Sequence, residues 1–74
     1  MYKRIKELRE DNDMLQKQIA IALNITRQQY GLYETGIRKI PLEKIITLAK
    51  FYNTSIDYIV GLTNQIKPYP RANK

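Results

Sequence analysis

The sequence predicts a compact all-α domain built from five helices. Apolar side chains recur every three or four residues in successive short segments, which is the spacing of one buried helix face. Residues that begin or end helices stand between these segments, and no stretch shows the alternation of a strand or an internal repeat. Seventy-four residues suffice for one apolar core but not for two.

The first two helices follow from apolar spacing and a cap. The first is expected from about Tyr2 to Asp11, with Ile5 and Leu8 on its inner side. Asp13 could cap the second helix, with Gln16 three residues later as its capping-box partner. The second helix should bury Ile19, Ala20 and Leu23.

A tight turn should join the second helix to the third. Asn24 tolerates the left-handed conformation that ends a helix, and Ile25 would fill the turn. Thr26 is a favourable N-cap for a helix from Arg27 to about Thr35, and Gly36 ends that helix. The small side chain of Ala20 would let the two helices cross closely.

The fourth and fifth helices complete the domain. Pro41 is expected as the first residue of helix four, after a loop over residues 37–40. Thr54 or Ser55 caps the short fifth helix, which Gly61 ends. The domain should cover residues 1–64, followed by a basic tail with two prolines over residues 65–74. The residues expected on the buried face of helix four are Leu42, Ile45, Ile46, Ala49 and Tyr52.

The charge of the chain favours a polyanionic partner. Its formal charge is +6 at pH 7, and nucleic acid is the commonest partner of basic domains. Half of the excess comes from Lys67, Arg71 and Lys74 in the tail. A soluble domain with a cationic tail would explain the composition equally well.

Several function classes are excluded by residues that the sequence lacks. There is no Cys and no His, which excludes disulfides, the usual zinc sites, and thiol or imidazole catalysis. The seven carboxylates show no spacing of a paired acid and base, so we expect no enzyme, no metal and no cofactor. No apolar run approaches the roughly 18 residues of a membrane span, and no signal-peptide core is present, so a cytoplasmic protein is expected.

The order of the segments carries a family resemblance. It covers roughly residues 2–62 and is similar to the helix-turn-helix family of phage repressors and Cro, also called the XRE family. The resemblance implies a lambda-repressor-like fold whose second and third helices form the DNA-binding pair. The segments that carry it are RIKELRE, LQKQIAIALNIT, RQQYGLYETG, PLEKIITLAKFYN and TSIDYIVG.

The outward face of helix three suits base reading. Tyr30, Tyr33 and Glu34 share the face that would turn toward the core. Gln can pair with adenine, Arg with guanine, and Leu can touch a thymine methyl. A solvated helix face is the alternative for these polar residues. The positions that the resemblance implies as base contacts are Arg27, Gln28, Gln29, Gly31 and Leu32.

Gly31 leaves two explanations open. A glycine inside a helix costs roughly 0.5–1 kcal/mol relative to Ala. Its absent side chain could allow close approach to the DNA, or the position could read nothing.

Other residues are expected on the phosphate backbone. Gln16 matches a phosphate-binding position of the family, with capping of helix two as its other possible role. Tyr33 could donate through its hydroxyl, although core packing is the better explanation for its ring. The expected phosphate contacts are Gln16, Thr26, Tyr33, Arg38 and Lys39.

The resemblance also implies a structural ion pair between Arg9 and Glu34. Both lie on the inner sides of their helices. Such a pair is weak evidence for net stability, but loss of one partner would leave a buried charge.

The leading hypothesis is a sequence-specific regulator of transcription, a repressor, that binds a palindromic operator as a homodimer. The alternatives are an antitoxin that regulates its own operon and a helical interaction module that does not bind DNA. No effector pocket can be argued from the sequence. Residues near the C-terminus that could form the dimer contact are Tyr58, Ile59, Leu62 and Ile66, with packing under the first helix as the competing explanation, strongest for Ile59.

Overall fold

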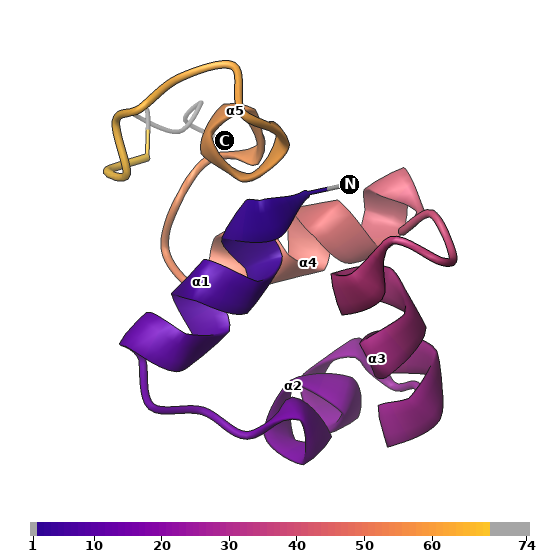
Figure 1. Ribbon diagram of the computed structural model, residues 1–74. Coiled ribbons are helices and arrows are strands. Elements are labelled where there is room, and N and C mark those ends of the chain that lie inside the picture. The colour runs from indigo at the N-terminus through magenta and orange to yellow at the C-terminus, as the bar shows by residue number, and fades with distance from the viewer. Residues whose placement is uncertain (1, 69–74) are drawn as a thin grey trace.

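The computed structural model describes residues 2–68 and is all-helical over that range. Its helices are α1 (Lys3–Asp11), α2 (Gln16–Leu23), α3 (Arg27–Thr35), α4 (Leu42–Phe51) and α5 (Ile56–Val60). Figure 1 shows α2 and α3 together at one end of the molecule and α5 at the other, with α1 and α4 between them. The predicted five-helix fold is confirmed.

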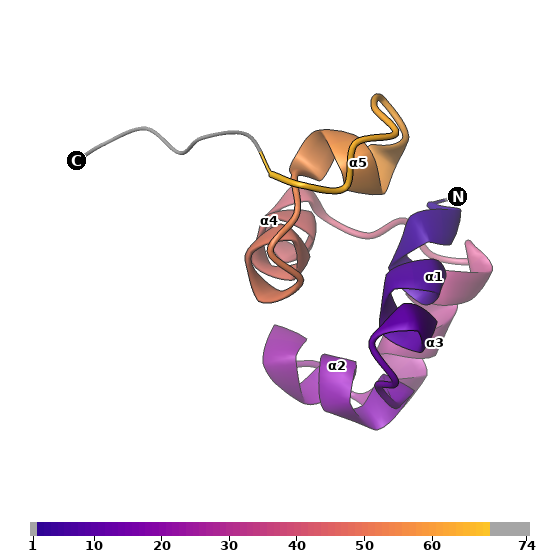
Figure 2. The same cartoon turned by 90° about the vertical axis from the view of Figure 1, so that its left-hand side faces the viewer.

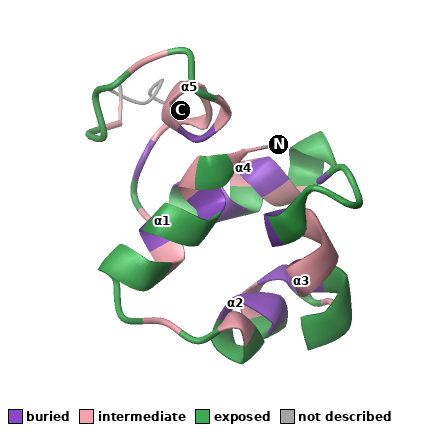
Figure 3. Ribbon diagram, in the orientation of Figure 1, coloured by how far each residue is buried: buried purple, intermediate pink, exposed green. Residues whose placement is uncertain are grey.

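One apolar core holds the helices together. α2 packs on α3 and α4, while α1 contacts α3 and α5. Figure 3 shows the buried positions on helix sides that face one another and the exposed positions outside. Ring and aliphatic groups from all five helices contribute, and Tyr30, Ile5, Ile19, Leu48 and Ile59 are the largest fully buried side chains.

The turn between α2 and α3 has the predicted geometry. Asn24 adopts the left-handed conformation with φ 59°, and its N–H is bonded to the carbonyl of Ala20. Thr26 is the N-cap of α3, and Gly36 ends the helix with φ 81°. Because both ends of α3 are fixed by local side-chain and backbone chemistry, its bounds match those expected from the sequence.

The predicted start of α2 is wrong. Asp13 has a positive φ of 55°, whereas an N-cap residue needs extended backbone. Leu15 holds the N-cap position instead, with φ −88° and ψ 152°. The side-chain oxygen of Gln18 accepts a hydrogen bond from the N–H of Leu15 at 2.7 Å. Gln16 is therefore not a capping partner of Asp13, and its side chain is available for other contacts.

The predicted face of α4 needs two corrections. Leu42, expected in the core, is 62% exposed because it stands in the first turn, ahead of the part that the other helices cover. Leu48 is fully buried and joins Ile45 and Ala49 on the inner face. Pro41 occupies the N-cap position, one residue before the helix begins.

Arg4 holds the end of the domain against α1. Its guanidinium donates to the carbonyls of Tyr58 and Thr63 and to the side-chain oxygen of Asn64. The same group lies 4.1 Å from the centre of the Tyr58 ring, a cation–π contact. The chain that follows α5 is thereby fixed against the first helix.

Side-chain hydrogen bonds fix both the start of α5 and the segment that follows it. The hydroxyl of Ser55 caps α5 by accepting from the N–H of Tyr58 at 3.0 Å. Thr54 is buried, and its hydroxyl donates to the carbonyl of Ile66 at 2.5 Å. Contact with the core thus reaches into the segment expected as a tail, and Arg71 and Lys74 lie outside the described residues.

Candidate nucleic-acid interface

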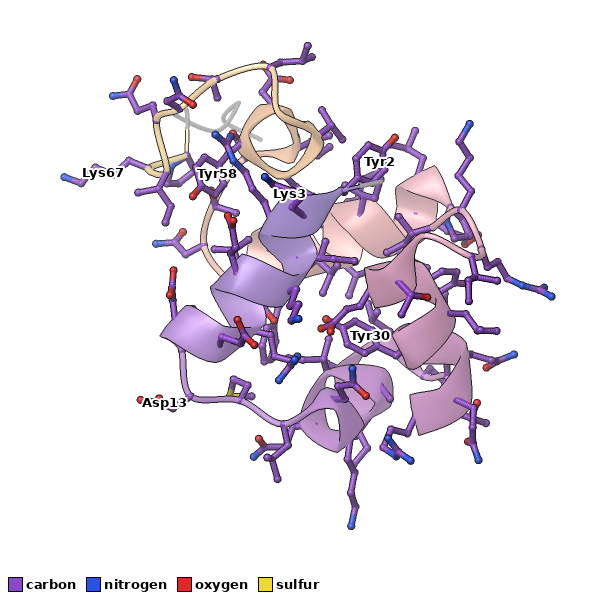
Figure 4. All side chains as sticks on the ribbon, viewed as in Figure 1. Tyr2, Lys3, Asp13, Tyr30, Tyr58 and Lys67 are labelled. Atoms are coloured by element: carbon purple, nitrogen blue, oxygen red, sulfur yellow. The ribbon has the colours of Figure 1, made fainter. Side chains whose placement is uncertain are left out.

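Helix α3 presents polar side chains outward and fixes its other face in the core. Tyr30 is fully buried and points inward from α3 in Figure 4, and Glu34 is 8% exposed. Arg27, Gln28 and Gln29 are exposed at the N-terminal end of the helix. The helix is therefore anchored through one side while its first turn is free to meet a partner.

Gln29 has a structural role that counts against the base contact expected of it. Its side-chain oxygen accepts from the N–H of Thr26 at 3.0 Å, and its own N–H donates to the Thr26 hydroxyl at 3.1 Å. This is a capping box. Bidentate pairing with adenine needs both ends of the amide, and here the oxygen end is engaged. Gln28 has no such contact among the described side chains.

Gln16 links the buried pair to the first turn of α3. Its amide nitrogen donates to Glu34 at 3.1 Å, and its oxygen accepts from Arg27 at 3.4 Å. A Cβ placed on Gly31 would lie 3.8 Å from the same oxygen, an ordinary contact. The side chain of Gln16 thus lies against α3 next to Gly31, between Arg27 and Glu34. The free protein has room for a methyl group at this glycine.

Arg9 and Glu34 form a two-point ion pair between α1 and α3. The Arg9 Nε lies 2.6 Å from Oε2 of Glu34, and Nη2 lies 3.2 Å from Oε1. Arg9 also donates to the carbonyl of Met14 at 3.0 Å, which holds the segment between α1 and α2. The side chains are 13% and 4% exposed, respectively.

The pair shifts the ionisation of its members and their neighbour. Burial opposes the charge on Glu34, but the hydrogen bonds from Arg9 and Gln16 lower the pKa of that carboxyl. The hydrogen bond to Glu34 raises the pKa of Arg9. Burial, followed by the influence of Glu34, raises the pKa of Tyr30. All three groups keep their ordinary charge at neutral pH.

The loop after α3 carries two cations close to the C-terminal half of that helix. Arg38 and Lys39 are exposed, and the N–H of Arg38 donates to the carbonyl of Leu32 at 3.1 Å, which holds the loop against α3. Leu32 and Tyr33 are half-buried. The structure brings Tyr33, Arg38 and Lys39 together around one hollow of about 180 Å³.

The candidate dimer residues differ in exposure. Ile59 is 1% exposed and packs in the core, so it is not accessible for a dimer contact. Tyr58 is half-buried beneath Arg4. Leu62 and Ile66 are 77% and 49% exposed and stay available for a partner.

Sequence reasoning missed contacts made across long separations. The ammonium of Lys44 in α4 donates to the carbonyl of Leu23 at 2.8 Å, at the C-terminal end of α2. Tyr2 lines the hollow beside the α3–α4 loop. No local pattern predicts either contact, because each joins segments more than 20 residues apart.

The family is decided by a match over most of the described domain. The sequence model of the helix-turn-helix family matches residues 5–59. The chain belongs to the phage repressor/Cro-like helix-turn-helix family. In this helix-turn-helix domain α2 and α3 are the pair that names the family, joined by the left-handed Asn24.

Named relatives are regulators of transcription. The uncharacterized HTH-type transcriptional regulator YobD of Bacillus subtilis is 38% identical over 65 residues, which cover 88% of this chain and 58% of YobD. The B. subtilis regulator AnsR is 32% identical, over 93% of this chain and 60% of AnsR. The cryptic phage CTXphi transcriptional repressor RstR of Vibrio cholerae is 33% identical, over 78% and 52%.

The helix-turn-helix chain spans about half to three fifths of the length of these relatives. No solved structure gives a significant match to it. Over residues 2–68, no helix has the length and apolar character needed to cross a membrane.

Proposed function

We propose that this chain is a sequence-specific, double-stranded-DNA-binding regulator of transcription, a repressor that acts as a homodimer on a palindromic operator. The observation that carries the proposal is the first turn of α3, where Arg27 and Gln28 are exposed on a helix whose other face is fixed by Tyr30 and Glu34. Arg and Gln are the side chains that read guanine and adenine in the major groove. Family membership supports the same conclusion.

Phosphate contacts would position α3 in the groove. Arg38 and Lys39 extend from a loop whose backbone is hydrogen-bonded to α3 through the N–H of Arg38, so the loop that carries their charges is held beside that helix. Thr26 is exposed at the N-terminus of α3, where backbone N–H groups favour anions. Gln16 could reach a phosphate by exchanging its contact with Arg27, which at 3.4 Å is the longer of its two hydrogen bonds.

The outer face of α3 argues against one of the two alternatives and does not distinguish the other. A module that binds only protein predicts acids or large apolar groups on the outer face of α3, whereas Arg27 and Gln28 stand there. An antitoxin would also bind DNA, so it differs from the proposal by its additional protein partner rather than by this face. We propose no catalytic function, since the sequence has no Cys or His.

The proposal is tested by selecting binding sites from random duplexes at two salt concentrations. We expect a palindromic consensus with half-sites roughly 10 bp apart and an affinity that falls steeply as salt rises. Gln28→Ala should relax preference at one base position and leave the salt dependence unchanged, whereas Arg38→Ala should weaken all sequences and lower the salt slope by about one. Salt-sensitive binding without a consensus would reduce the proposal to a basic surface.

A further inference from the structure

A small hollow lies where the N-terminal end of the domain meets the loop after α3. Its volume is about 180 Å³. Figure 4 shows Tyr2 just ahead of α1, on the side toward the loop that joins α3 to α4. We call this the Tyr2 hollow. It is lined by Tyr2, Tyr33, Gly36, Arg38, Lys39 and Ile40.

The lining of the Tyr2 hollow suits an anion. Tyr2 and Tyr33 each carry a hydroxyl that can donate a hydrogen bond, and Arg38 and Lys39 each carry a positive charge. Ile40, which is 5% exposed, gives it an apolar wall. Among residues 2–68, no carboxylate lines it. The larger hollow beside α1, about 800 Å³, is lined by Glu7, Glu10 and Glu34 as well as by cations, so it lacks this preference.

The backbone of the loop that carries Arg38 and Lys39 is fixed against α3. Gly36 turns the chain out of the helix in the left-handed conformation. The N–H of Arg38 then bonds to the carbonyl of Leu32, inside α3. An anion in the Tyr2 hollow would therefore be held at a set distance from the reading end of the helix, which is how phosphate contacts fix register on a duplex.

We propose that Tyr2 completes a seat for one phosphodiester group of the DNA backbone, with its hydroxyl donating to a phosphate oxygen beside Tyr33, Arg38 and Lys39. This inference rests on the proposed function and adds to it a contact from outside the helix-turn-helix pair. Tyr2 stands 24 residues before the N-cap of α3 and reaches the site because α1 packs on α3.

The test compares Tyr2→Phe with the wild type on the selected duplex by fluorescence anisotropy. Loss of one exposed hydrogen bond to a charged oxygen should weaken binding about three- to tenfold, on specific and random duplexes alike. The salt slope should not change, because no cation is removed, whereas Lys39→Ala should lower it by about one. Tyr52→Phe is the matched control: its hydroxyl is buried and makes no hydrogen bond within the described chain, so affinity should be kept.

A scan of duplexes with single methylphosphonates then locates the contact. At one position the methylphosphonate should weaken binding of Tyr2→Phe at least about threefold less than it weakens binding of the wild type, which would show that the two changes are coupled. Equal affinity of Tyr2→Phe and wild type, or additive losses at every position, would overturn the inference and leave the proposed function intact. If the wild type binds no duplex, both fail. Inorganic phosphate that binds Tyr2 without competing with the duplex would also overturn it.

Discussion

Glu34 is the residue at which three helices meet. Its carboxylate accepts from Arg9 of α1 and Gln16 of α2 while its own backbone belongs to α3. The side-chain oxygen of Gln16 in turn accepts a hydrogen bond from Arg27 at the N-terminal end of α3. The orientation of α3 and the position of Arg27, a proposed base contact, thus depend on the same buried charge.

Replacing Glu34 by Gln should destabilise the fold before it affects any base contact. At pH 7 we expect a loss of roughly 3 kcal/mol in the free energy of unfolding, since Arg9 is left partly buried without a counter-charge. Glu10→Gln, an exposed change on α1, is the control. Urea unfolding of both variants measures the difference. Normal unfolding combined with lost DNA binding would contradict this structural role.

The same residue sets a pH dependence with a defined sign. The pKa of Glu34 is lowered in the folded state from its usual value near 4.5. Its stabilisation is therefore complete above that value and is lost as pH falls through the folded-state pKa. The stability difference between wild type and Glu34→Gln should shrink in urea unfolding below pH 4.5. A difference that stayed constant to pH 3 would show that the charge of Glu34 is not what stabilises the fold.

For individual residues, the sequence predicted which side of a helix is buried better than it predicted which side chains are in contact. Glu34 and Tyr30 were expected on the inner side of α3 from helical spacing, and both are buried. The two hydrogen bonds of Gln16 were not expected, because they depend on where α2 crosses α3. Helical periodicity gives the side of a helix on which a residue lies, but not what stands opposite.

Helix ends that depend on the conformational preferences of nearby residues were predicted closely. The ends of α3 depend on Thr26 and Gly36, whose preferences act within a few residues. The start of α2 was misplaced because Leu15 has no side chain that can cap, and the contact comes from Gln18 toward the backbone of Leu15 instead. A capping box is recognised in a sequence by a polar N-cap residue and a Glu or Gln three residues later. Here only the second of these, Gln18, is present, so the sequence signature is incomplete.

Lys44 connects two elements and offers a test at this scale. Its ammonium meets the carbonyl of Leu23, one of the unpaired acceptors at the end of α2. Lys44→Met keeps most of the apolar stem and removes the charge, so we expect a loss of about 1 kcal/mol in stability. Lys50→Met, on the exposed side of α4, should change stability by less than about 0.5 kcal/mol. Urea unfolding that gives equal losses for both would contradict a specific role for Lys44.

The whole molecule has two ends with different surfaces. Figures 1 and 2 show α5 and residues 61–68 at the opposite end from α2. Arg4 fixes this segment through Thr63 and Asn64, which leaves Leu62 exposed beside it. Two copies could therefore join through the α5 end without covering the outer face of α3. The composition of the sequence indicated apolar residues there, but only packing separates the buried Ile59 from the exposed ones.

Leu62 should act in pairing two copies rather than in folding. It is 77% exposed, so Leu62→Ser should leave the melting temperature nearly unchanged. If it lies in the dimer contact, the variant should shift sedimentation toward the monomer and bind a palindromic duplex at least about tenfold more weakly, because the second half-site no longer adds its affinity. Binding to a single half-site should be unaffected. Ile21→Ser, at 71% exposure on α2, is the matched control and should leave sedimentation unchanged. A Leu62→Ser protein that sediments and binds as the wild type does would remove Leu62 from the contact, and the same pair of measurements on Ile66→Ser would then test the remaining exposed candidate.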